Sequence, residues 1–209
     1  MLFLLYLALA LCLTWPLAMH LGVALPLGTE SSGTVTLFNL WTMEWNAHSL
    51  WRGYVEYFDA PIFYPTKDTF VLSDPQPASG LLYAFFRTIC GSSVVAYNLL
   101  FLFFLTTNGL AAAALLRSLK IPRAGAMLAG AIVIGLPFIN NELGVLQLTV
   151  IAPALLAMRA FVRFSARPGY GRAFMLGLLA ALTFLSSSYY GIFLLLLLVL
   201  ISPFLVQRE

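Results

Sequence analysis

Long apolar runs alternate with short polar segments along the chain. The runs cover residues 2–19, 94–116, 124–139, 148–162, 173–185 and 189–206. A helix that crosses the hydrocarbon core of a bilayer needs about 20 mostly apolar residues. The third and fifth runs are shorter, and each can borrow flanking residues at the membrane interface. The pattern predicts an all-α polytopic membrane helix bundle of about six transmembrane helices, in one integral membrane domain over residues 1–209.

The composition excludes a soluble globular protein. The 209 residues are 61% hydrophobic and 9% charged, whereas a soluble domain carries about 25% charged residues. The net charge is +3, but no basic stripe is interleaved with exposed aromatic residues, so nucleic acid is not expected as a partner. Cys12 and Cys90 lie far apart without metal-like spacing, and we expect each to be a small apolar filler.

Positive residues gather in alternate connections between the apolar runs. They follow the second, fourth and sixth runs, as Arg117, Lys120, Arg123, Arg163, Arg167, Arg172 and Arg208. Because cytoplasmic loops carry the excess of Lys and Arg, both termini are predicted to be cytoplasmic. All but Glu209 of the eight acidic residues then fall on the outer side. A cleaved signal peptide is the alternative for the first run, which lacks the usual positive n-region.

The predicted outer loop, residues 20–93, contains two candidate interfacial helices. Residues 35–53 repeat apolar and tryptophan side chains at three- and four-residue steps, and tryptophan prefers the membrane interface. Residues 78–90 are too few to cross a bilayer and include Arg87, which indicates an interfacial or re-entrant helix. The four prolines of residues 58–77 break any helix there. An extended, ordered segment is expected, and long ordered loops are usually functional.

Six short motifs occur in an order typical of one membrane protein family. They are "PLGTE" (26–30), "LFNLWTMEWN" (37–46), "FDAPIFYPTKDTFVLSDPQP" (58–77), "AYNLL" (96–100), "LQL" (146–148) and "LSSSYYG" (185–191). In this order the chain resembles the N-terminal half of bacterial GT-C superfamily glycosyltransferases, and more narrowly a group of large multi-span proteins of that kind. The resemblance implies a multi-helix bundle in the bacterial inner (cytoplasmic) membrane. It also implies inverting transfer of a sugar from a polyprenyl-phosphate donor to an acceptor on the outer face.

The resemblance further implies catalytic carboxylates in the outer loop. Glu30 is the first candidate for the base, because the family places its first acidic residue shortly after the first span. Asp74, in "SDPQP", is the second candidate, as a partner of the base or a metal ligand. A positioned carboxylate can take the proton of a hydroxyl acceptor as that oxygen attacks the anomeric carbon. For both residues the alternative is a solvated loop carboxylate.

Polar residues in the other outer segments are the candidates for substrate binding. They are Asn39, Gln76, Asn140, Gln147, Tyr189 and Tyr190. The two tyrosines have an alternative role in packing at the membrane interface. No metal site is expected from the spacing of His and Cys, and no cofactor is assigned. A role for a divalent metal ion in stabilising the leaving phosphate is left open.

The chain also departs from the family's pattern. Many relatives have Asp near Thr34 or Val35, and many have His where this chain has Val145. Family members usually run to several hundred residues. We therefore expect an N-terminal part, or a half that assembles with a second membrane chain supplying missing helices. The expected partners are this second chain, a lipid-linked sugar donor and membrane lipid.

Two other classes of function stay open. A non-catalytic protein acting in assembly or lipid binding would use the same polar outer loop without turnover. A transporter fragment is disfavoured, because transporters place ionisable groups inside their spans. Here the spans contain almost none, and Arg159, near the edge of the fourth run, is the nearest.

Overall fold

The computed structural model describes residues 1–29 and 32–206, and helices are the only regular elements in those ranges. The longer ones are α1 (Leu2–Leu13), α2 (Thr34–Trp51), α3 (Pro77–Cys90), α4 (Ser93–Ser118), α5 (Arg123–Ile134), α8 (Ala152–Ala166), α9 (Tyr170–Ser186) and α10 (Ser188–Val206). The short ones are η1 (Leu17–Met19), η2 (Thr69–Leu72), α6 (Pro137–Asn141) and α7 (Leu146–Thr149). The described part of the chain confirms the predicted all-α class.

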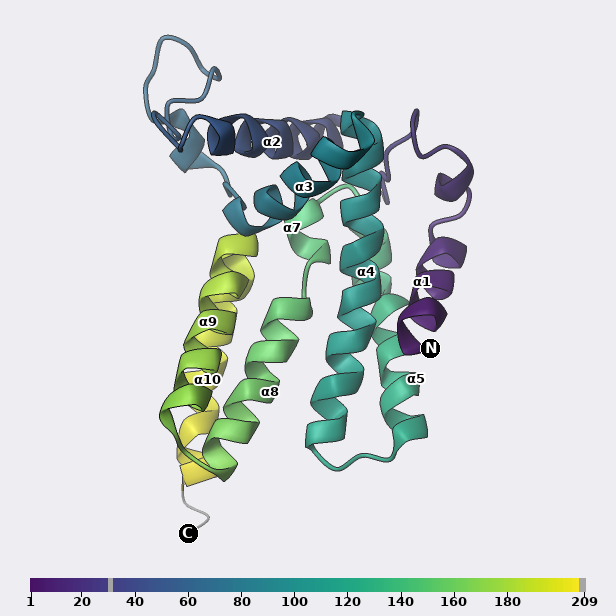
Figure 1. Ribbon diagram of the computed structural model, residues 1–209, viewed down its shortest axis with the longest axis vertical. Coiled ribbons are helices and arrows are strands. Elements are labelled where there is room, and N and C mark those ends of the chain that lie inside the picture. Colours follow the sequence, from purple (N-terminus) through teal and green to yellow (C-terminus); the bar gives the residue numbers. More distant parts are fainter. Residues whose placement is uncertain (30–31, 207–209) are drawn as a thin grey trace.

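Helix α4 is the centre of the bundle. It packs against α1, α3, α5 and α8, and it carries several of the largest fully buried side chains, among them Tyr97, Phe101 and Leu105. Figure 1 shows α4, α5, α8, α9 and α10 running in similar directions, with α2 lying across one end of them. We call this the α2–α3 end of the bundle.

Two glycines let three helices approach closely. A Cβ atom on Gly130 of α5 would lie 2.2 Å from the Tyr6 hydroxyl of α1 and 2.5 Å from the Gly109 carbonyl oxygen of α4. The Tyr6 hydroxyl donates a hydrogen bond to the Met127 carbonyl oxygen at 3.0 Å. Small residues at such contacts are typical of helix packing inside membranes.

Within the described ranges, three helical segments are long and apolar enough to cross a bilayer. They are Ser93–Ser118, Arg123–Asn141 and Leu146–Ala166. Three further apolar helices, Leu2–Leu13, Tyr170–Ser186 and Ser188–Phe204, are shorter. A membrane protein is therefore indicated, and six crossings remain a prediction.

Three of the predicted continuous helices are broken, each beside a proline. Helix α1 ends at Leu13, before Pro16. The third run divides into α5 and α6 before Pro137, and the fourth divides into α7 and α8 before Pro153. Proline lacks an N–H group and disfavours the helical conformation of the residue before it. The polarity pattern alone does not reveal these breaks.

A buried asparagine satisfies the backbone at the break between α7 and α8. Asn108 of α4 donates through Nδ2 to the Thr149 carbonyl oxygen at 2.7 Å. Its Oδ1 accepts hydrogen bonds from the backbone N–H groups of Ile151 and Ala152 at 3.1 and 2.8 Å. The amide therefore replaces helical hydrogen bonds that the break removes.

Apolar side chains cover the outside of α1, α9 and α10. The exposed ones include Phe3, Leu4, Leu5, Phe174, Leu178, Phe193, Leu196, Leu200 and Phe204. Exposed apolar surfaces of this extent mark contact with lipid or with another protein. The connections from α4 to α5 and from α8 to α9 lie at the end of the bundle away from α2 and α3 (Figure 1). The arginine-rich connections therefore share one end of the molecule.

Candidate functional site

An aromatic cluster fixes the segment between α2 and α3. Phe70 is fully buried, and its ring makes edge contacts with Trp41 and Tyr57. Trp45 Nε1 donates a hydrogen bond to the Tyr57 carbonyl oxygen at 2.9 Å. The proline-rich segment is therefore packed on α2, as expected of an ordered loop, and it delivers Asp74 and Gln76 to the start of α3.

Three amide side chains meet where this segment ends. Gln76 Nε2 donates to Asn39 Oδ1 at 3.0 Å and to Gln147 Oε1 at 3.4 Å. Asn39 comes from α2, Gln76 directly precedes α3, and Gln147 lies in α7. Asn39 and Gln76 are each 2% exposed. We call these three residues the amide cluster, and it unites three predicted substrate-binding residues from distant parts of the sequence.

The amide cluster and its surroundings have unused hydrogen-bonding capacity. Gln76 Oε1 is buried and has no hydrogen-bond partner in the described part of the chain. The same holds for the hydroxyl oxygens of Thr42, Ser79 and Ser187, from α2, α3 and the residue before α10. Buried polar atoms without partners are costly, and water or a bound polar ligand usually satisfies them. A ligand rich in hydroxyl groups would supply such partners.

Asp74 lies between the amide cluster and the first turn of α10. Its Oδ2 accepts a hydrogen bond from the Ser188 backbone N–H at 3.2 Å, and Gln76 Nε2 lies 3.5 Å from its carbonyl oxygen. Burial raises the pKa of Asp74 above its ordinary value, and hydrogen bonds from Ser188 and Gln76 offset part of that rise. The carboxylate therefore has an increased proton affinity, which suits a general base.

Asn46 and Tyr57 belong to the same region, and the motifs did not single them out as site residues. Asn46 Nδ2 donates to the Pro75 carbonyl oxygen at 2.7 Å, and the Tyr57 hydroxyl donates to Asn46 Oδ1 at 2.7 Å. A Cβ atom on Gly80 would lie 2.3 Å from the Asn46 Cβ, so α2 and α3 touch here. Asn46 follows Asn39 by seven residues, which puts both on one face of α2. That spacing is the sequence signal that could have found it.

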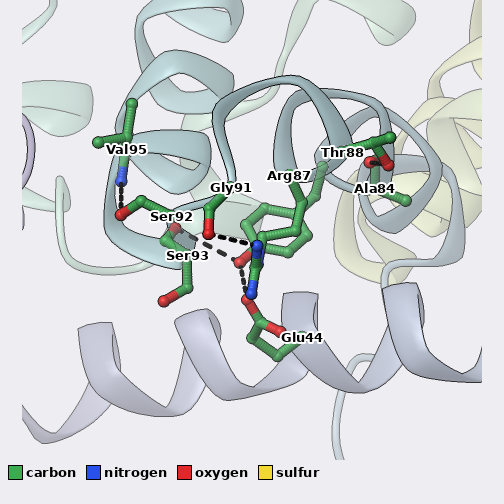
Figure 2. A network of polar contacts seen from close by, with 9 residues as sticks. Glu44, Ala84, Arg87, Thr88, Gly91, Ser92, Ser93 and Val95 are labelled. Atoms are coloured by element: carbon green, nitrogen blue, oxygen red, sulfur yellow. Dashed lines mark hydrogen bonds and ion pairs between the residues drawn. The ribbon is translucent and has the colours of Figure 1, made fainter.

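Glu44 forms an ion pair that joins α2 to α3. Figure 2 shows Arg87 pointing from α3 toward Glu44, and its Nε lies 2.9 Å from Glu44 Oε1. Arg87 Nη1 also donates to the Gly91 carbonyl oxygen at 2.7 Å. The Tyr83 hydroxyl donates to the same carboxylate, and burial raises the pKa of Tyr83. These contacts assign Glu44 to holding the two helices together.

Three predicted substrate-binding residues lie apart from the amide cluster. Asn140 Nδ2 donates to the carbonyl oxygens of Ile134 and Leu136, at 3.2 and 3.0 Å, and so caps the break between α5 and α6. The Tyr190 hydroxyl donates to the Leu148 carbonyl oxygen at 2.6 Å. Tyr189 is 54% exposed. The contacts of Asn140 and Tyr190 are structural, and Tyr189 faces outward.

Glu30 lies outside the described residues. The segment before it, residues 26–29, packs on the connection between α6 and α7. Thr29 donates to the Asn141 carbonyl oxygen through its N–H at 2.8 Å and through its hydroxyl at 3.0 Å. Gly28 has φ +64°, and a Cβ there would lie 2.3 Å from that carbonyl oxygen, so only glycine fits this turn. Residues 27–29 and residues 141–144 are therefore neighbours.

No group of three or more His, Cys, Asp and Glu side chains in the described ranges is arranged to hold a metal ion. A cavity of about 230 Å³ lies beside residues 24–27, lined mainly by apolar side chains together with Thr14 and His20. A larger cavity, of about 630 Å³, lies between α8 and α9. Its lining includes four arginines and does not include Asp74.

Comparison of the chain with protein-family models, with curated proteins and with solved structures gave no match. The functional argument therefore rests on the residues and contacts described above.

Proposed function

We propose that this chain is a GT-C-like membrane glycosyltransferase, or the N-terminal part of one. It transfers a sugar from a polyprenyl-phosphate donor to an acceptor on the outer face of the membrane. The observation that carries the proposal is Asp74, a half-buried carboxylate with a raised pKa beside the amide cluster. Perturbed carboxylates next to unsatisfied polar groups are typical of catalytic sites.

The proposed membrane arrangement has six spans, with both termini in the cytoplasm. The three long apolar segments and the three shorter apolar helices would supply them. The arginine-rich connections would be cytoplasmic, which follows the positive-inside rule. Helices α2 and α3 would then lie on the outer surface, across one end of the bundle (Figure 1). Asp74 would lie on the same side, because it precedes α3 by three residues.

The proposed chemistry needs a base and a group that binds the sugar. Glu30 is the first candidate for the base, with Asp74 as its partner or replacement. The acceptor hydroxyl gives its proton to the carboxylate as its oxygen attacks the anomeric carbon from the face opposite the phosphate. The bond from that carbon to the phosphate oxygen breaks, and polyprenyl phosphate leaves with its electron pair. The amide cluster would bind the sugar hydroxyl groups, and a divalent metal ion is an optional aid to the leaving phosphate.

The test is a transfer assay on the chain purified in mild detergent. Polyprenyl-phosphate-linked hexoses serve as donors, and an extract of the native membrane serves as the acceptor source. Glu30→Gln and Asp74→Asn should each lower turnover by about 100-fold or more, as expected when a general base is lost. Asp68→Asn is the matched control, because Asp68 is an exposed carboxylate of the same loop and its left-handed backbone suits asparagine. Native mass spectrometry should show a donor-sized adduct on the wild type.

The alternative function is non-catalytic assembly or lipid binding, in which a second membrane chain covers the exposed apolar helices. It is favoured if the wild type transfers no sugar and co-purifies with a protein partner. Turnover that survives both Glu30→Gln and Asp74→Asn would refute the assigned roles of the two carboxylates.

A further inference from the structure

One cavity of the described structure is strongly basic. It has a volume of about 630 Å³ and lies between α8 and α9. Four of its lining residues are arginines, Arg159, Arg163, Arg167 and Arg172, and none of the lining residues is acidic. The turn that joins α8 to α9 is at the end of the bundle away from α2 and α3 (Figure 1). The cavity is therefore separate from the amide cluster and from the proposed transfer reaction.

The four arginines lie at different distances from the turn between α8 and α9. Arg163 and Arg159 are one helical turn apart on α8, so Arg159 lies about 6 Å further from the turn. Arg163, Arg167 and Arg172 are exposed, whereas Arg159 is half-buried. Arg172 also donates a hydrogen bond to the Arg167 carbonyl oxygen, which closes the turn at the mouth. The positive charges therefore line the mouth and continue inward to Arg159.

One N–H group of the deepest arginine is unsatisfied in the described part of the chain. The Nε atom of Arg159 is buried, and its N–H group donates no hydrogen bond within the described residues. Among the described residues, the side chains that form an ion pair are Arg87 and Glu44, which lie in α3 and α2 and not beside Arg159. The positive-inside rule explains exposed arginines at a cytoplasmic end, but it gives no reason to bury one. A buried N–H group without a partner is costly, and an anion beside Arg159 would supply the missing acceptor.

The remaining walls of the cavity are apolar. Leu156 and Ala160 of α8 and Met175 and Leu179 of α9 continue the lining beyond the arginines. Apolar walls do not favour the binding of a free anion, whereas the acyl chain of a lipid can pack against them. We propose that this cavity binds the phosphate headgroup of an anionic membrane phospholipid, with part of an acyl chain along the apolar walls. Basic pockets between helices at a cytoplasmic surface are known to favour such headgroups.

The test is native mass spectrometry of the full chain in detergent, with equal amounts of phosphatidylglycerol and phosphatidylcholine. The wild type should retain phosphatidylglycerol in preference. Arg159→Gln and Arg172→Gln should each weaken that retention about fivefold, the factor that corresponds to about 1 kcal/mol for a basic residue at a membrane surface. Arg123→Gln is the matched control, because it removes an exposed arginine at the start of α5 that is not among the lining residues.

Three results would overturn the proposal. Equal retention by the wild type and both cavity variants would mean that the arginines bind no lipid. Equal losses in Arg123→Gln would mean that surface charge alone attracts the lipid. Inorganic phosphate is added in a separate arm, and displacement of phosphatidylglycerol by millimolar phosphate would identify a free-anion site instead. Arg172→Gln keeps the test valid if Arg159→Gln fails to fold, because Arg172 is exposed.

Discussion

Asp74 makes the stability of the protein depend on pH in an unusual direction. Burial raises its pKa above 3.8, so the folded protein binds this proton more tightly than the unfolded chain does. The free energy of unfolding should therefore fall as the pH rises from about 4 through the folded pKa. Asp74→Asn removes this penalty while its amide oxygen can still accept from Ser188. We expect the Tm of the variant in detergent to exceed that of the wild type at pH 7 and to equal it at pH 3.

The reverse order of Tm values at pH 7 would contradict this expectation. It would mean that the hydrogen bonds from Ser188 and Gln76 stabilise the charged carboxylate by more than burial destabilises it. Measuring the Tm of the wild type and of Asp74→Asn between pH 3 and pH 7 separates this effect on stability from the loss of turnover expected of the same variant in the proposed reaction.

At the scale of single residues, the sequence predicts the site only in part. The polarity of the predicted outer segments indicates Asn39, Gln76 and Gln147 as site residues, and the structure brings them together. The same reasoning indicates Asn140, yet its amide caps a helix break, because Pro137 interrupts the apolar run beside it. The role of an amide depends on which backbone groups lie nearby, and those are set by tertiary contacts that one sequence does not display.

At the scale of helices, the closest packing occurs where α1, α4 and α5 meet. Gly130→Ala would place a methyl group against the Tyr6 hydroxyl and the Gly109 carbonyl oxygen. Overpacking of this kind costs about 1–3 kcal/mol, which lowers the Tm of a protein of this size by about 2–4 °C per kcal/mol. Gly177→Ala on α9 is the matched control, since its new Cβ meets nothing within 4 Å. The control should leave the Tm unchanged or raise it, and an equal fall in both would contradict the packing argument.

The apolar runs predict where helices form better than where they end. The apolar run 94–116 predicts α4 closely, and the helix covers residues 93–118. The agreement is good because no proline interrupts the run and because Ser92 accepts a hydrogen bond from the Val95 N–H at the start of the helix. The run from 148 to 162 is broken instead, at a point where Asn108 of α4 takes over the backbone hydrogen bonds. That exchange involves residues more than 40 positions apart, which no local pattern contains.

At the scale of the whole molecule, the segregation of charge gives a testable topology. In a background with Cys12 and Cys90 replaced by serine, Asp68→Cys should react with a membrane-impermeant maleimide on intact cells. Arg123→Cys should react only after the membrane is permeabilised, because α5 begins at the arginine-rich end. Both parent residues are exposed, so access to the reagent is set by the bilayer. The opposite labelling pattern would place Asp74 in the cytoplasm and would exclude transfer on the outer face.

Hydrogen bonds between segments far apart in the sequence hold the α2–α3 end together. Thr29 bonds to Asn141, Gln76 to Gln147, and Asp74 to Ser188. A ribosome makes these residues in order, so the contact of Asp74 with Ser188 cannot form until α10 has begun to emerge. Until then the α2–α3 end of the nascent protein is incomplete, and the insertion of α10 completes the surroundings of Asp74.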